Sequence, residues 1–261
     1  MIRALNTAAT GMAAQQANVD VIANNMANVN TTGFRRSRAE FEDLIYHTVR
    51  TAGGTTAGGQ ALPTGIQVGH GVRNVSTEFM HIQGNLQQTE NPLDLAIEGD
   101  GFFKVTRPSG EVAYTRAGNF KADAEGRLVN VDGYPLEPSL NIPIDATSIT
   151  ITPDGIVSVQ IAGQSATQQV GQITLSNFPN PGGLRALGRG LFVPTDGSGQ
   201  AVESQPGQQG LGTVGQGMLE GSNVEVVNEM IDLIASQRAY EINQRIVQAA
   251  DDMLRKTTEG I

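Results

Sequence analysis

The first 26 residues carry mainly apolar side chains at alternating intervals of three and four positions. This spacing places them on one stripe of a helix. The opposite face consists of amides, alanines and threonines, because only two of the first 33 residues are charged. Thr31-Thr32-Gly33 ends the pattern, and glycine readily adopts the left-handed conformation that follows a helix end. The predicted stripe comprises Ile2, Leu5, Ala9, Met12, Gln16, Val19, Ile22, Ala23 and Met26.

The last forty residues show a similar pattern with more apolar positions. Ser222 and Glu225 have the spacing of a capping box, which predicts that a helix begins there. An antiparallel hairpin of the two terminal helices within one monomer is the simplest arrangement, but it covers one stripe, so we expect other subunits to cover the second. One stripe comprises Val224, Val227, Ile231, Ile234, Ile242, Ile246, Ala249 and Met253, and the other Met230, Leu233, Tyr240, Val247 and Leu254.

Residues 35–220 are rich in glycine, proline and aspartate, and they contain short segments in which apolar and polar residues alternate. A period of two is typical of a β-strand with one buried face. Thr152-Pro-Asp-Gly155 is a turn sequence between two such segments. The alternating segments are Val75–Phe79, Leu93–Ile97, Ile149–Ile151 and Val157–Ile161.

These patterns predict an α+β fold in which paired N- and C-terminal α-helices, resembling a coiled coil, flank a central β-rich domain. Thr51–Gln60 has the composition of a flexible loop, and Thr195–Gly217 is expected to be a second irregular stretch. The predicted boundaries are 1–33 for the N-terminal helix of a polymerisation domain, 34–72 for an extended connector with the glycine-rich loop, 73–220 for a β-rich outer domain, and 221–261 for the C-terminal helix of the polymerisation domain.

The charge balance argues against nucleic acid as a partner. The chain has 17 Lys and Arg against 26 Asp and Glu, so a phosphate-binding surface would form against a net charge of -9. Only 16% of the residues are charged, whereas the chain has 17 Asn and 20 Gln. Amides cost less to desolvate than charges, which suits a protein that buries its surface against other chains. We expect no membrane span and no cleaved signal peptide, because no apolar run is long enough.

Few residues could carry catalytic or metal chemistry. The chain has no cysteine and three histidines, which leaves no thiolate nucleophile and few metal ligands. Asp94, Glu98 and Asp100 could be imagined as a general acid and base, but period two places them on one face of a strand, which is typical of a solvated surface. Gly182–Gly190 lacks the Lys-Ser/Thr of a phosphate loop and favours a turn between strands. We therefore expect no enzyme, no metal and no cofactor.

Charged and amide residues gather where the two predicted helices meet the middle of the chain. Three arginines follow the first helix and three acidic residues open the last one: Arg35, Arg36, Arg38, Glu225, Glu229 and Asp232. Such clusters usually form solvated faces, but in stacked subunits opposite charges could pair between neighbours. The predicted inter-subunit charge contacts are Arg35, Arg36, Glu225 and Glu229.

Asparagine is a poor helix former, yet Asn24, Asn25 and Asn28 lie together near the end of the first helix. Asn24 and Asn28 are four residues apart on one face. Their amides could form hydrogen bonds across a helix–helix seam and specify its register, as a buried asparagine does in coiled coils. A fraying helix end is the alternative.

Four segments resemble the bacterial flagellar rod and hook proteins. Ala23–Arg36, with the sequence ANNMANVNTTGFRR, resembles their N-terminal signature. Leu93–Phe103 and Tyr114–Phe120 are similar to segments of their β domain, and Ser236–Asn243 to their C-terminal helix. The resemblance therefore extends over essentially the whole chain.

Within this family, the chain length and three further segments favour the distal rod form over a longer proximal rod subunit, which is the alternative. These segments are Phe41–Tyr46, Leu62–Val72 and Gln237–Glu241. The resemblance implies a structural subunit that polymerises helically into the rigid drive shaft of the basal body, transmits torque from motor to hook, and encloses the export channel. A monomeric β-rich binding module would explain the middle of the chain but not its two amphipathic ends.

The resemblance also implies partners and a location. Expected partners are further copies of the chain, proximal rod proteins, the hook protein, the peptidoglycan-layer and outer-membrane ring proteins, and the flagellar type III export apparatus. The expected location is the basal-body rod in the periplasm. The predicted polymerisation interface comprises Ile2, Leu5, Met12, Val19, Ile22, Asn24, Asn25, Met26, Asn28, Val227, Ile231, Ile234, Gln237, Arg238, Tyr240, Ile242, Ile246 and Met253.

Overall fold

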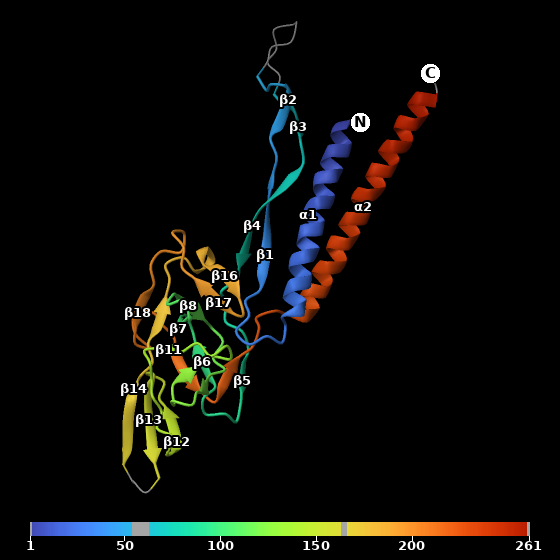
Figure 1. Cartoon of the computed structure of the whole chain (residues 1–261). Coiled ribbons are helices and arrows are strands. Elements are labelled where there is room, and N and C mark those ends of the chain that lie inside the picture. The colour runs from blue at the N-terminus through green and yellow to red at the C-terminus, as the bar shows by residue number, and fades with distance from the viewer. Residues whose placement is uncertain (1, 54–62, 163–165, 260–261) are drawn as a thin grey trace. The chain divides into compact units, whose positions relative to one another are not determined.

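The computed structural model describes residues 2–53, 63–162 and 166–259 of the 261-residue chain (Figure 1). The fold is α+β, with one long helix near each end of the chain and strands between them, as the sequence predicts. The chain divides into two compact units. Unit 1 contains residues 1–26, 37–78 and 226–261, and unit 2 contains residues 27–36 and 79–225.

The two helices of unit 1 lie side by side and run in opposite directions (Figure 1). Helix α1 spans Ile2–Ala27 and α2 spans Val226–Glu259. The predicted first helix is confirmed, and Gly33 beyond it has the expected left-handed backbone, with φ +68°.

The predicted start of the second helix at Ser222 is wrong, because α2 begins four residues later. The Ser222 hydroxyl accepts a hydrogen bond from the Val224 N–H at 3.2 Å instead of closing a capping box. The Asn223 side chain accepts from the Arg36 N–H and donates to the carbonyl oxygens of Met80 and Ile82. These bonds hold the segment before α2 in a non-helical conformation.

Unit 1 also contains two pairs of strands, which lie within the predicted connector and at the start of the predicted β domain. Strand β1 (Ser37–Asp43) pairs with β4 (Val72–Phe79), and β2 (Tyr46–Arg50) pairs antiparallel with β3 (Ile66–Gly69). The predicted flexible loop Thr51–Gln60 falls largely outside the described residues.

Unit 2 is built from short antiparallel strands. Its largest sheet has the order β16-β17-β8-β7-β15-β18, with β11 paired to β7, and a second sheet has the order β12-β13-β14. Smaller pairs are β19 with β6, β20 with β5, and β10 with β9, and one 3-10 turn, η1, covers Pro181–Gly183. The strands of the large sheet are β7 (Phe102–Thr106), β8 (Val112–Thr115), β11 (Leu136–Glu137), β15 (Leu175–Asn177), β16 (Arg185–Gly188), β17 (Leu191–Val193) and β18 (Val202–Ser204). The others are β5 (Leu86–Gln88), β6 (Leu95–Glu98), β9 (Lys121–Ala122), β10 (Leu128–Val129), β12 (Ala146–Ile151), β13 (Ile156–Ile161), β14 (Thr167–Gln172), β19 (Thr213–Gln216) and β20 (Met218–Glu220).

The predicted hairpin around Thr152–Gly155 is confirmed: the Gly155 N–H donates to the Thr152 carbonyl at 2.8 Å, and β12 pairs with β13 on either side. The prediction that Thr195–Gly217 is irregular is wrong, because this stretch contains β18 and β19. Its amides and glycines hide the strand signal, since neither strand alternates apolar and polar residues clearly.

The core of unit 2 is continuous and apolar. Leu95, Phe103, Phe120 and Leu175 have no exposed surface, and the rings of Phe103 and Phe120 meet edge to face with centroids 5.2 Å apart. A smaller aromatic cluster lies on the other side of β7, because successive side chains of a strand point to opposite faces. It contains Phe102, Tyr114, Phe178, Leu184 and Phe192.

Candidate assembly surface and buried charge network

One face of α2 exposes a long row of large apolar side chains. Val227, Ile231 and Ile242 retain 66, 59 and 58% of their surface, so these side chains are not core residues of the subunit. Single exposed apolar residues are ordinary, but many of them along one face of a helix mark an interaction surface. We call this row the outer row of α2; it comprises Val227, Met230, Ile231, Ile234, Ile242, Ile246 and Met253.

The opposite face of α2 faces α1 and contains polar residues at every seventh position. The Asn25 amide donates to the buried Glu229 carboxylate at 3.3 Å, and the Asn18 amide donates to the Ser236 hydroxyl at 2.8 Å. Seven residues further along α2, Asn243 lies against Gly11 of α1. The contact is so close that a Cβ atom on Gly11 would lie 3.0 Å from the Asn243 amide nitrogen.

These three contacts define a polar seam. Each step of seven residues toward the start of α1 is matched by a step of seven toward the end of α2, as antiparallel helices require. Asn25 also anchors β1, because its amide donates to the Ser37 carbonyl and accepts from the Ser37 N–H, both within 2.9 Å. The seam therefore fixes the register of the helix pair and the position of the first strand beside it.

The predicted interface residues divide between the seam, the outer row and the remaining surface. On α1, Ile22 and Asn25 are buried, and Asn24 is exposed; the Ile2 side chain lies outside the described residues. The hypothesis that a buried asparagine sets helix register was made for Asn24 and Asn28, whereas the buried asparagine at the α1–α2 contact is Asn25, and the half-buried Asn18 lies one step along it. Leu5, Met12, Val19, Met26 and Asn28 are half-buried, and the exposed set is Val227, Ile231, Ile234, Gln237, Arg238, Tyr240, Ile242, Ile246 and Met253.

The four residues predicted to form charge contacts between subunits differ in burial. Arg35 and Glu229 are only 2 and 1% exposed, and each has a partner in its own subunit, Glu220 and Asn25 respectively. Both side chains are therefore buried within the subunit and not part of its exposed surface. Glu225 is exposed and Arg36 is half-buried.

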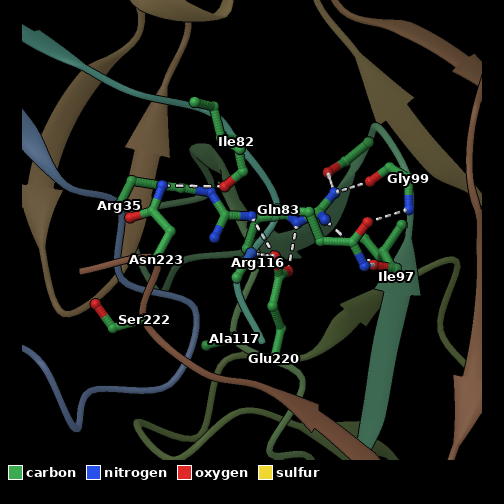
Figure 2. Close-up of polar contacts among 12 residues, drawn as sticks. Arg35, Ile82, Gln83, Ile97, Gly99, Arg116, Ala117, Glu220, Ser222 and Asn223 are labelled. Atoms are coloured by element: carbon green, nitrogen blue, oxygen red, sulfur yellow. Dashed lines mark hydrogen bonds and ion pairs between the residues drawn. The ribbon is translucent and has the colours of Figure 1, made fainter. Parts of the chain in front are cut away.

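Unit 2 contains a buried network of three charged residues, Arg35, Arg116 and Glu220 (Figure 2). Both oxygens of the Glu220 carboxylate accept guanidinium hydrogen bonds, from Arg35 Nη2 to Oε1 and from Arg116 Nε to Oε2, each at 2.8 Å. The Gly84 N–H also donates to Oε1 at 2.8 Å. Arg116 uses its other nitrogens on the carbonyl oxygens of Ile97, Gly99 and Gly101.

This Arg–Glu–Arg network joins segments that are far apart in the sequence. Arg35 follows the turn after α1, Arg116 follows β8, and Glu220 ends β20 just before the chain returns to α2. Removing one member of such a network leaves an uncompensated buried charge, which destabilises a fold strongly. Gly33 supports the junction: its N–H donates to the Glu220 carbonyl at 2.8 Å, and a side chain there would strike the backbone of Ala117.

Sequence reasoning did not single out Glu220, Arg116 or Ser236. Arg116 lies inside the family-like segment Tyr114–Phe120 and Ser236 begins the family-like segment Ser236–Asn243, so the resemblance gave a signal for these two residues but none for Glu220. Asp94 was expected on a solvated strand face, and that prediction is wrong: its carboxylate is buried and accepts hydrogen bonds from Thr89 and Asn91.

The described residues show neither a metal cluster nor a membrane-spanning helix. No group of three or more His, Asp or Glu side chains in this part of the chain is arranged to hold a metal ion. Within the same residues, no helix combines the length and apolar character that a membrane crossing requires.

Three family models match the chain. The model of the flagella basal body rod protein matches residues 5–35, that of the flagellar hook protein FlgE/F/G D1 domain matches residues 96–159, and that of the flagellar basal body rod FlgEFG protein C-terminal region matches residues 216–259. The matches therefore include α1, part of unit 2, and α2.

Curated relatives extend the match over the full length. The flagellar basal-body rod protein FlgG of Caulobacter vibrioides is 50% identical over 99% of both chains, and that of Borreliella burgdorferi is 50% identical over 97% of both. FlgG of Bacillus subtilis is 39% identical over 98% of both chains, whereas the hook-basal body complex protein FlhP of the same organism is 28% identical over 97%. The chain therefore belongs to the FlgG family of flagellar basal-body rod proteins, structural proteins of the distal rod.

Proposed function

We propose that this protein polymerises helically into the distal rod through its terminal helices, with the outer row of α2 buried against neighbouring subunits. The rod made in this way transmits torque from motor to hook and encloses the export channel. The observation that carries the proposal is the outer row itself, because its side chains stay exposed although the polar seam already occupies the other face of α2.

The energetics favour assembly. Full burial of one Ile or Met side chain stabilises a contact by about 1.5–3 kcal/mol. The seven side chains of the outer row are 44–66% exposed, so covering each of them contributes about half of that value. Together they offset several kcal/mol of the translational and rotational freedom that each association step loses. The seam bonds are made within the subunit, so they add rigidity to the helix pair before assembly rather than contacts between subunits.

Two charged residues of unit 2 supply the proposed axial contacts. Glu225 is exposed and Arg36 is half-buried at the surface of unit 2. We assign inter-subunit pairing to these two and to the exposed part of the predicted interface, including Asn24, Gln237 and Arg238. Arg35 and Glu229 contribute indirectly, by holding the segments that carry these residues in place.

Partners and location follow from the same proposal. The chain polymerises with itself between proximal rod proteins and the hook protein, inside the peptidoglycan-layer and outer-membrane rings, after passage through the flagellar type III export apparatus. Its place is the periplasmic rod of the basal body, its export needs no cleaved signal, and its role is structural rather than enzymatic.

The first experiment deletes the gene and images isolated basal bodies by electron microscopy, with a plasmid-borne copy as control. A proximal rod stub without hook and outer ring, restored by the plasmid, is the expected result. A basal body that ends before the proximal rod would instead assign the chain to a proximal subunit. Complete hook-bearing basal bodies in the deletion strain would contradict the proposal and favour the monomeric binding module.

A second experiment tests the outer row directly. The double variant Ile231→Glu, Ile242→Glu places two charges in it, and Ile144→Glu is the matched control because Ile144 of unit 2 is 86% exposed. Sedimentation and electron microscopy of the purified full chain over a range of concentrations should show polymers for the wild type and the control and monomers for the double variant. Equal assembly of all three would contradict the assigned surface.

A further inference from the structure

The two arginines of the Arg–Glu–Arg network differ in how many of their guanidinium nitrogens form hydrogen bonds. All three guanidinium nitrogens of Arg116 donate hydrogen bonds to described residues, whereas Arg35 donates only from Nη2. Arg35 is only 2% exposed, and its Nε and Nη1 are shielded from solvent. Neither atom has a hydrogen-bond partner among the described residues. A buried guanidinium with unused donors is costly, because each N–H has lost its water without gaining an acceptor.

A cavity of about 160 Å³ has the Arg35 side chain in its wall and lies entirely within unit 2. Arg35, Arg116 and His81 belong to its wall, together with Gln83 and Pro181. A cavity needs only about 10–15 Å³ to hold one water, so this one has room for a small polyatomic ion and accompanying waters. Figure 2 shows how Arg35 and Arg116 converge on Glu220.

The charges around the cavity do not cancel. Two guanidinium groups face one carboxylate, that of Glu220, and the Asp100 carboxylate in the same wall belongs to an exposed residue. Both ring nitrogens of His81 are shielded from solvent and make no hydrogen bond of normal geometry with a described residue. Burial, then the positive charges of Arg35 and Arg116, lower the pKa of His81 from 6.5 to about 4, while the Pro181 carbonyl opposes this weakly. The buried charges of the site, two guanidinium groups and the Glu220 carboxylate, thus carry one net positive charge, because the exposed Asp100 carboxylate is hydrated.

We propose that this cavity binds one small monovalent carboxylate, toward which the Arg35 guanidinium turns so that Nε and Nη1 donate hydrogen bonds to it. One negative charge balances the excess guanidinium, and carboxylate oxygens match the unused donors. The carboxylate is either a free ion, such as formate or acetate, or the side chain of a neighbouring subunit that enters the cavity on assembly. Only the second source depends on the proposed polymerisation.

The test measures the histidine ring signals of the unassembled full chain by NMR while sodium formate or acetate replaces a bulky sulfonate at constant ionic strength. His81 should show a saturable shift, and its pKa should rise by about one unit or more, because an opposite charge within hydrogen-bonding range favours the protonated ring. His47 and His70 belong to unit 1, so their signals serve as internal controls and should not respond.

Arg35→Lys keeps the positive charge but removes the Nε and Nη1 donors, and it should weaken binding at least tenfold. Arg189→Gln is the matched control, because it removes an exposed positive charge from the same unit. If Arg35→Lys fails to fold, the saturable response of wild-type His81 decides alone.

Assembly separates the two sources of carboxylate. A His81 response to formate in monomers identifies a free ion. A response that appears only when subunits assemble in carboxylate-free buffer identifies a neighbouring side chain. No response in either arm, or equal weakening by Arg189→Gln, would overturn the proposal and leave water as the partner of Arg35.

Discussion

Leu95, Ile97 and Phe103 of unit 2 are completely buried, whereas Val227, Ile231 and Ile242 of unit 1 are more than half exposed. Both sets are large and apolar, so composition does not distinguish them. Unit 2 closes its strands around its own core, while α2 has one covered face and one uncovered face. The comparison indicates that unit 2 supplies its own stability and that unit 1 reaches its full stability only when other chains cover it.

Matched truncations should break this comparison most clearly. Leu95→Ala removes a fully buried side chain and should lower the free energy of unfolding of unit 2 by about 2–5 kcal/mol. Ile242→Ala should change the stability of the unassembled chain by less than about 0.5 kcal/mol, because Ile242 is 58% exposed. Urea unfolding followed by circular dichroism and residue-specific NMR measures both.

In polymerisation, Ile242→Ala should have the larger effect and Leu95→Ala the smaller one, which reverses their order in the stability of the unassembled chain. Ile242→Ala should raise the concentration needed for polymerisation about tenfold or more, because about 1.4 kcal/mol of lost contact energy is a factor of ten. Leu95→Ala should leave that concentration nearly unchanged at temperatures where unit 2 stays folded. Equal costs of the two truncations in the monomer would show that α2 is already covered without other subunits.

The next largest difference should be in pH dependence: acid should destabilise unit 2, because His81 is buried in it. Its pKa of about 4 lies below the ordinary 6.5, so the unfolded chain binds the proton first as the pH falls. Unit 2 should therefore lose up to about 3 kcal/mol of stability from this group between pH 6.5 and pH 4 in carboxylate-free buffer. The measurement is urea unfolding across this range, with His81→Gln and, as a control, His47→Gln.

The expected result is a flatter pH dependence for His81→Gln and an unchanged one for His47→Gln, since His47 is exposed in unit 1. Parallel pH profiles for His81→Gln and the wild type would mean that His81 does not carry the effect. Added formate should flatten the wild-type profile if the cavity binds a carboxylate, because it raises the pKa of the histidine.

The polar seam is the part of unit 1 that does not depend on neighbours, and Asn25 is its most buried contact. Asn25→Ala leaves Glu229 without this amide donor and removes two backbone bonds to Ser37. It should destabilise unit 1 by about 1–3 kcal/mol. Hydrogen exchange of the α1 and α2 amides measures the loss, with Asn6→Ala on the exposed face of α1 as control. Unchanged exchange would contradict the assigned seam.

Local patterns predicted the elements but not the partners of the buried polar residues. Helix α1 and the Thr152–Gly155 turn were readable because each depends on residues within a few positions of one another. The two predicted stripes of α2 are not separate faces, because Met230 of the second stripe lies exposed beside Val227 and Ile231 of the first, and polar residues occupy the face toward α1. The bond between Arg116 and Glu220 joins residues 104 positions apart, and no local signal marks an arginine that becomes buried. The start of α2 was predicted too early because Asn223 bonds to distant backbone groups, which override the capping box.

The smallest expected effect is that of a substitution at Ser236, in the middle of the seam. It tests which seam contacts determine the register of α1 and α2. Ser236→Ala removes the acceptor of the Asn18 amide, but Asn18 is half-buried, so water can replace the hydroxyl and the cost should be about 0.5–1 kcal/mol. The register should not change, because Asn25 with Glu229 and Gly11 with Asn243 still fix the seam on either side of Ser236. NMR contacts between α1 and α2 test this, with Ala235→Ser on the exposed side of α2 as a control for composition. A shifted set of contacts in Ser236→Ala would mean that the central hydrogen bond, rather than the two flanking contacts, selects the register.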